Sequence, residues 1–359
     1  MKTKRLNNVE LLRILSMLMV LTLHYLSFGG FLPKYTTFSF SSMAIWFFES
    51  LSFVAVNCYV LISGYFLIKS KFKLEKLFQL CLEVLFYSIF IYAIMIIFGK
   101  VNFSISSFAK SFLPVFLGNY WFVTCYVMLY VLSPFINKLI LNLSKEEYKK
   151  LIGIILLAFS VWATFIPNNH TINYGGSYSI SWFICLYLIS GYIRLHLDLD
   201  SVNKYICLGL YLFCSLINTV TYFLIPTTNY IRNDFLYNYY SITMVIGAVS
   251  LFLYFLKFKI NSDILNKVIS FVSPTTFGIY LIHENPNIRN FLWSTFNISA
   301  LKISGGGVLI INIIFTPILL FICFCLIDKL REVIFNLFYK TSIYRKIKIK
   351  LGSVEYEKS

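Results

Sequence analysis

Three side chains that can do chemistry lie inside an apolar run near the start of the chain. Residues 9–26 read VELLRILSMLMVLTLHYL, and Glu10, Arg13 and His24 interrupt the run. Arg13 and His24 are eleven residues apart, so on a helix they share one face and lie about 16 Å apart along the axis. An imidazole can act as a general base on a hydroxyl, or carry a transferred group as a covalent intermediate. A guanidinium can bind phosphate groups.

Both residues also have purely structural explanations. Arg13 is close enough to the helix end to extend its charge to the lipid headgroups, and Glu10, three residues earlier, can pair with it. His24 can simply make a hydrogen bond between helices. From the spacing of these residues alone, the structural and the catalytic explanations both remain open.

The composition shows why such residues need an explanation. Hydrophobic residues make up 58% of the 359 residues and charged residues 13%, with a mean hydropathy of +0.76. Soluble domains carry about twice that share of charge. We therefore predict a polytopic membrane protein, in which each ionisable group inside a span is a functional candidate. The first run is too long for a cleavable signal peptide, and we expect it to be a retained helix.

Ten apolar stretches approach the roughly 20 residues needed to cross the hydrocarbon core. They are 9–28, 42–68, 77–98, 118–137, 150–166, 180–196, 203–225, 238–257, 269–290 and 306–328. The ninth stretch is interrupted by Pro274, His283, Glu284 and Pro286, and we expect it to be kinked or broken where it lines a cavity. With the N-terminus in the cytosol, 24 of the 31 Lys and Arg residues fall inside and 6 outside, as the positive-inside rule requires.

The predicted fold is thus all-α, with about ten transmembrane helices and both termini cytoplasmic. Residues 1–335 form the membrane domain and 336–359 a basic cytoplasmic tail. The net charge of +16 is mostly an orientation signal and a contact surface for anionic membrane lipid, so we expect no nucleic-acid partner. The eight cysteines lie in apolar segments without zinc-ligand spacing, so we interpret them as packing residues and expect no metal.

Matching the depths of the spans places further polar residues beside His24. On straight helices Glu49, in the second span, and His283 and Glu284, in the ninth, lie in the same outer half of the membrane. The sequence therefore predicts an outer catalytic cluster of His24, Glu49, His283 and Glu284.

A second, inner group lies at the depth of Arg13. Glu83, early in the third span, is at that depth, and Arg194 is a further candidate. Such a charged site could hold the phosphates of a cytosolic donor. Glu83, like Glu49, could instead be the structural partner of a basic group.

Five stretches resemble, in chain order, the acyltransferase 3 family, membrane O-acyltransferases that decorate bacterial surface glycans. The first is NNVELLRILSMLMVLTLHY, which contains the family's Arg followed by ten residues and a His, here Arg13 and His24. The others are VLISGYFL (60–67), NYWFVTCYVMLYVLSPFI (119–136), WFICLYLISGYIRL (182–195) and SPTTFGIYLIH (273–283). The resemblance spans nearly the whole chain.

The resemblance implies transfer of an acyl group, usually acetyl, from cytosolic acyl-CoA to a glycan hydroxyl at the outer face. Acyl-CoA, in the family's default case acetyl-CoA, is then a donor substrate and not a permanently bound cofactor. Arg13 and His24 would be essential, with His24 catalytic, and His283 matches the family's Tyr-Leu-x-His stretch. We expect no counterpart of the extra extracytoplasmic domain that some relatives carry. We therefore expect it to acylate a surface polysaccharide or lipid-linked sugar in the bacterial cell membrane directly, or with polysaccharide-assembly proteins.

Two other classes of protein remain open. A transporter or flippase for a glycan or lipid precursor would also use intramembrane His and Glu, although no inverted repeat is visible. A structural subunit of an assembly machine would tolerate replacement of both Arg13 and His24. Trp121 and Trp182 belong near outer span ends, where an aromatic belt is expected, and sugar stacking is an alternative for both.

Overall fold

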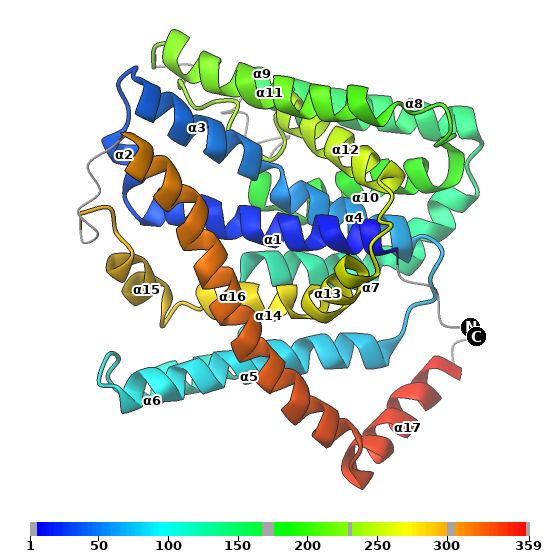
Figure 1. Ribbon diagram of the computed structural model, residues 1–359. Helices are drawn as coiled ribbons and strands as arrows, with labels where there is room; N and C mark the ends of the chain where they lie inside the picture. The colour runs from blue at the N-terminus through cyan, green and yellow to red at the C-terminus, as the bar shows by residue number, and fades with distance from the viewer. Residues whose placement is uncertain (1–5, 167–175, 229–231, 300–305, 357–359) are drawn as a thin grey trace.

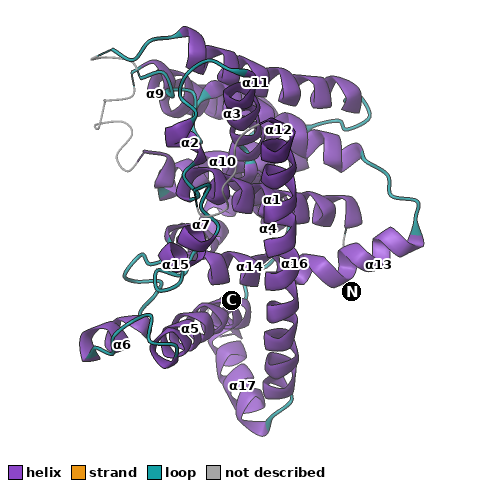
Figure 2. Cartoon of the chain, turned by 60° about the vertical axis from the view of Figure 1, so that its left-hand side comes forward, coloured by secondary structure: helices purple, strands orange, loops and turns teal. Residues whose placement is uncertain are grey.

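The computed structural model describes residues 6–166, 176–228, 232–299 and 306–356, and every regular element in these ranges is helical (Figures 1 and 2). Seven helical stretches there are long and apolar enough to cross a membrane. They are α1 (Asn7–Phe28), α3 with α4 (Phe40–Phe53, Ala55–Leu67), α5 (Leu74–Ile97), α7 (Trp121–Leu141), α8 to α9 (Lys145–Leu156, a π-helical turn Leu157–Trp162, Ala163–Phe165), α11 (Lys204–Leu224) and α16 (Gly306–Tyr339).

Two shorter apolar helices also lie in the bundle, α10 (Ile180–His196) and α12 (Ile242–Lys257). The remaining helices are α2 (Phe31–Lys34), α6 (Ile105–Ser111), α13 (Asp263–Val272), α14 (Thr276–His283), α15 (Arg289–Thr295) and α17 (Ser342–Tyr356). The all-α, multi-pass prediction is confirmed. The count of ten crossings and the cytosolic placement of both termini stay predictions.

The expected break in the ninth span is present. Its helical stretch is divided into α13 and α14 by a 3₁₀ turn, Ser273–Thr275, which contains Pro274. Proline lacks the N–H that would continue the α-helical ladder, and it disfavours helical backbone at the residue before it. Pro286 follows shortly after α14 ends at His283, where it helps to stop the helix.

Helix α1 lies in the middle of the bundle (Figure 1), in contact with α3, α4, α12, α14 and α16. Helix α10 packs closely on α4 because Gly64 has no side chain at the crossing. A Cβ at Gly64 would meet the Ser190 hydroxyl and lie 3.2 Å from the Tyr187 backbone. Small residues allow such close approach between membrane helices, which gives the glycine of the VLISGYFL stretch a structural reason.

The segment predicted as a basic tail contains helix α17, which follows α16 directly. Figure 2 shows the end of α16 and the start of α17 projecting beyond the rest of the bundle, from where α17 runs back toward α5. Helix α17 is held against α5 at Glu75, whose carboxylate accepts a hydrogen bond from Tyr344 (3.0 Å) and pairs with Lys348 (3.0 Å).

Candidate functional site

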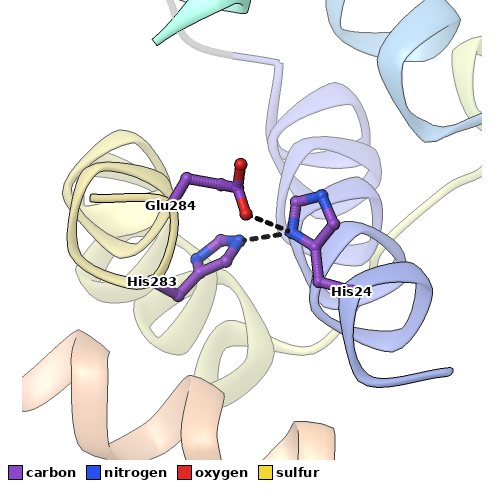
Figure 3. A group of neighbouring side chains, drawn as sticks. All are labelled: His24, His283 and Glu284. Carbon is purple, nitrogen blue, oxygen red and sulfur yellow. Dashed lines mark hydrogen bonds and ion pairs between the residues drawn. The ribbon is translucent and has the colours of Figure 1, made fainter. Parts of the chain in front are cut away.

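The outer site brings together two histidines and a carboxylate (Figure 3). His24 Nδ1 on α1 lies 3.1 Å from His283 Nε2 and 3.3 Å from a carboxylate oxygen of Glu284 at the end of α14. The side chain of His24 is 21% exposed, whereas His283 is fully buried and Glu284 nearly so. Three of the four residues predicted for the outer cluster therefore meet.

The hydrogen bonds fix where the protons lie. His283 Nδ1 is 2.6 Å from the Ile279 carbonyl oxygen, and because a carbonyl only accepts, this nitrogen carries the proton. The Nε2 atom of a neutral His283 is then an acceptor, so His24 Nδ1 must be the donor. The Nε2 atom of His24, on the far side of its ring in Figure 3, keeps its lone pair. This is the tautomer that a general base requires.

Arg289 completes the charge balance of this site. Its guanidinium lies 3.5 Å from the second oxygen of Glu284 and over the ring of Phe28. The sequence interpretation placed Arg289 outside the membrane and gave it no role. Its position five residues after Glu284, across a turn that contains Pro286, was the signal that could have linked the two.

A cavity of about 250 Å³ extends along the first helix between Arg13 and His24. Arg13 and His24 both line it, and the apolar face of α1 between them forms one wall, made by Met17, Val20 and Leu23. Opposite walls come from α4, α7 and α14. The broken helix contributes here as predicted, because Ser273, Pro274 and Thr276 all line the cavity.

Glu49 does not join the outer cluster. It is buried on α3, with 5% exposure, and is not among the residues that line the cavity. Its carboxylate interacts electrostatically with Tyr237 and Tyr239, and one of its oxygens has no hydrogen-bond partner among the described residues. Depth matching placed Glu49 at the right height, but it cannot tell which face of a neighbouring helix a residue occupies.

The three residues predicted for the inner site have separate partners. Arg13 pairs with Glu10 at 3.2 Å, as their spacing predicts. Arg194 donates a hydrogen bond to the Tyr65 hydroxyl at 2.8 Å, with its guanidinium over the Tyr65 ring. Glu83 pairs with Arg331 at 3.0 Å. Of the three, only Arg13 lines the cavity.

Glu83 belongs to a buried ionic network that the sequence interpretation missed. Arg331 makes two hydrogen bonds to Asp328, at 3.0 and 2.8 Å, and Tyr87 donates a third to Asp328 at 2.6 Å. Asp328 is fully buried and faces Gly278 on α14, where any Cβ would collide with its carboxylate. The predicted tenth span ended at residue 328, whereas α16 continues to Tyr339. The i, i+3 spacing of Asp328 and Arg331 was the signal in the sequence that could have revealed their ion pair.

The two tryptophans have different surroundings. Trp182 is buried and donates a hydrogen bond to Asn57 at 3.1 Å, which is a packing role. Trp121 lines the cavity, and its ring lies nearly parallel to that of Tyr239, another lining residue, with the ring centroids 6.1 Å apart. Trp121 is thus the tryptophan that can meet a substrate.

The outer site also has the composition of a metal site. One ligand atom from each of His24, His283 and Glu284 lies within 4.8 Å of the others. A hydrogen-bonded network accounts for the same arrangement, because His24 Nδ1 is a donor and Arg289 already places a positive charge beside Glu284. Arg289 is thus the cation beside Glu284, whereas Glu284 Oε1, 3.3 Å from His24 Nδ1, has no hydrogen-bond partner among the described residues.

Comparison with known proteins gives one match. Residues 6–328 match the acyltransferase 3 family model, which is described as an acyltransferase domain. No curated protein and no solved structure matches the chain. The matched range includes α1, the broken ninth span and α16 up to Asp328.

Proposed function

Because the chain belongs to the acyltransferase 3 family, we propose that this membrane acyltransferase moves an acyl group, normally acetyl, from cytosolic acyl-CoA to a hydroxyl of a cell-surface polysaccharide or its lipid-linked precursor. In this proposal the chain crosses the bacterial cell membrane ten times, with both termini in the cytosol. The observation that carries the proposal is the cavity that runs along α1 from Arg13 to His24.

The proposed reaction uses the free Nε2 atom of His24 as a general base. It takes the proton of the acceptor hydroxyl, whose oxygen attacks the thioester carbonyl. The carbon–sulfur bond then breaks. The imidazolium of His24 gives its proton to the departing sulfur, so that CoA leaves as the thiol. Glu284 and His283 hold His24 by Nδ1, and the Glu284 carboxylate stabilises the imidazolium during the step.

The donor enters from the Arg13 end in this proposal. Arg13 is 31% exposed at its side chain and faces the cavity, so its guanidinium is available to an anionic group. The apolar wall between Arg13 and His24 suits the arm that carries the acyl group. The separation of about 16 Å along the helix is then bridged by the donor itself.

Replacing Glu284 by glutamine tests the role of its charge. We expect a loss of about 10- to 100-fold in kcat, the usual value of a hydrogen bond to a charged group, with KM for acyl-CoA nearly unchanged. The measurement is steady-state transfer of labelled acetyl by the purified protein. Glu75→Gln, which alters a carboxylate at α17 far from the cavity lining, is the matched control. Equal losses in the two variants would contradict the assignment.

A chelator tests whether the outer site works without a metal. We expect EDTA treatment followed by dialysis to leave acyl transfer unchanged, because His24 Nδ1 is a donor toward His283 and Arg289 already places a positive charge beside Glu284. The transfer rate and the metal content of the protein are measured together. Lost activity that returns with Zn²⁺ would identify these side chains as metal ligands instead.

The proposed function itself is tested with purified protein in lipid nanodiscs. Labelled acetyl-CoA and an extract of lipid-linked or polymeric glycan should give thiol release matched by label in the glycan. Mass and NMR comparison of the surface polysaccharide, with and without the protein, then identifies the modified hydroxyl. A glycan that crosses the membrane without thiol release would favour the transporter alternative and overturn the proposal.

A further inference from the structure

A second hollow, of about 640 Å³, lies apart from the catalytic cavity. It is formed by the loop between α4 and α5, the second half of α7 and the end of α10. Its polar wall is basic, with the side chains of Lys69, Lys71 and Lys138. None of the residues that line it is acidic, and none of these three lysines has an ion pair among the described residues.

The basic loop is held in place from both ends. Asn137 donates a hydrogen bond from its side chain to the Leu67 carbonyl at 3.1 Å, just before the loop. The Tyr130 hydroxyl accepts one from the Lys73 backbone N–H at 3.0 Å, just after it. Two side chains of α7 therefore hold both ends of the loop that carries Lys69 and Lys71, so the backbone from which these lysines extend is positioned before any ligand binds.

The hollow and the catalytic cavity lie along the same face of α7. Tyr126 of α7 lines the cavity, and Ser133 and Asn137 line the hollow. They follow Tyr126 by seven and eleven residues, so all three lie on one side of α7, with Ser133 about 10 Å further along the axis. In Figure 1 the loop between α4 and α5 lies at the same end of the bundle as the start of α1. This is the predicted cytosolic end.

We infer that this hollow binds the phosphate groups of the nucleotide part of acyl-CoA, an inference that rests on the proposed function. Three ammonium groups in a lining without acidic residues favour a polyanion, and the Ser70 hydroxyl adds a polar group. Phe72, half-buried beside the lysines, adds an aromatic ring against which a base can stack. The arm of the donor then runs from the hollow, past Tyr126, to His24.

Phosphate chemistry has a second source here, the headgroups of anionic lipids. A lipid phosphate would also meet lysines at a cytosolic surface. The two sources differ in the group attached to the phosphate, because only acyl-CoA connects it to the thioester. A donor without the nucleotide therefore separates them.

The test compares acetyl-CoA with S-acetyl-pantetheine, which has no phosphate or adenine. The variant is Lys69→Gln, Lys71→Gln and Lys138→Gln together, in nanodiscs of neutral lipid and of anionic lipid. We expect KM for acetyl-CoA to rise about tenfold or more, with kcat and the KM for S-acetyl-pantetheine unchanged. The matched control changes the same number of lysines on α8, Lys145, Lys149 and Lys150, which do not line the hollow.

Each other outcome overturns the inference. An unchanged KM for acetyl-CoA, or an equal rise for both donors, shows that the hollow does not hold the nucleotide. A rise seen only in anionic lipid assigns the lysines to headgroups.

Equilibrium binding of CoA, measured in parallel, shows whether only the assignment of the hollow is wrong or the proposed acyl transfer as well. If the wild type transfers acetyl and the lysine variant binds CoA equally well, only the assignment of the hollow is disproved. If the wild type neither binds CoA nor releases thiol, both the assignment and the proposed function are disproved.

Discussion

Replacing His24 by glutamine is expected to slow acyl transfer by about 10² to 10⁴-fold, the usual contribution of a positioned general base. Glutamine keeps a hydrogen-bonding group near His283 and Glu284 but cannot take up a proton. KM for acyl-CoA should change little, because in the proposed function the donor's charged part binds toward the Arg13 end of α1, away from His24. Initial rates of labelled acetyl transfer give both constants.

His196→Gln is the matched control for this change. His196 ends α10, where its ring packs on Tyr148 and Tyr192, and it does not line the cavity. We expect its transfer rate to equal that of the wild type. Wild-type transfer by the His24 variant would remove His24 from the mechanism.

The same preparation decides between a base and an acyl carrier. A general base leaves no label on the protein when labelled acetyl-CoA is supplied without acceptor. An acyl-histidine intermediate would leave label that depends on His24 and is released by hydroxylamine. We expect none, because the hydroxyl and the thioester can react directly once both are beside His24 Nε2.

Replacing Arg331 by methionine is expected to lower the free energy of unfolding by about 3–5 kcal/mol, the usual cost of breaking a buried ion pair. The change leaves Asp328 and Glu83 as two carboxylates with no cation within pairing distance among the described residues. The measurement is reversible unfolding of the purified protein in mixed micelles.

An exposed pair of the same geometry supplies the control. Arg232 binds Asp234 through two hydrogen bonds, at 2.9 and 2.7 Å, much as Arg331 binds Asp328. The Arg232 side chain is 76% exposed, so Arg232→Met should have little effect on stability. If both variants lost stability equally, burial would not be the reason for the effect at Arg331.

The first helix shows what could be predicted from the sequence. Its eleven-residue spacing placed Arg13 and His24 on one face, and the structure shows both on one cavity. The proline-interrupted ninth span was expected to break beside a cavity, and it does. Both conclusions depend only on helix geometry and on the missing N–H of proline.

Glu49 and Glu83 show where such prediction ends. Depth along the membrane can be counted from the residues, but the choice of neighbouring helix cannot. Glu83 was matched with Arg13 by depth, while its actual partner, Arg331, comes from a helix almost 250 positions later. That partner lies beyond residue 328, where the tenth span was expected to end, whereas α16 continues about three turns further, to Tyr339.

The apolar lining of the cavity has a consequence for the membrane as a barrier. A passage from near one surface to the outer half of the bilayer is also a route by which ions and protons could leak. Met17, Val20, Leu23 and Phe122 line this passage, and narrow hydrophobic passages in channels stop conduction by excluding water. In the proposed function these side chains also accommodate the arm of the acyl donor, and we expect them to stop ions from following it across the membrane.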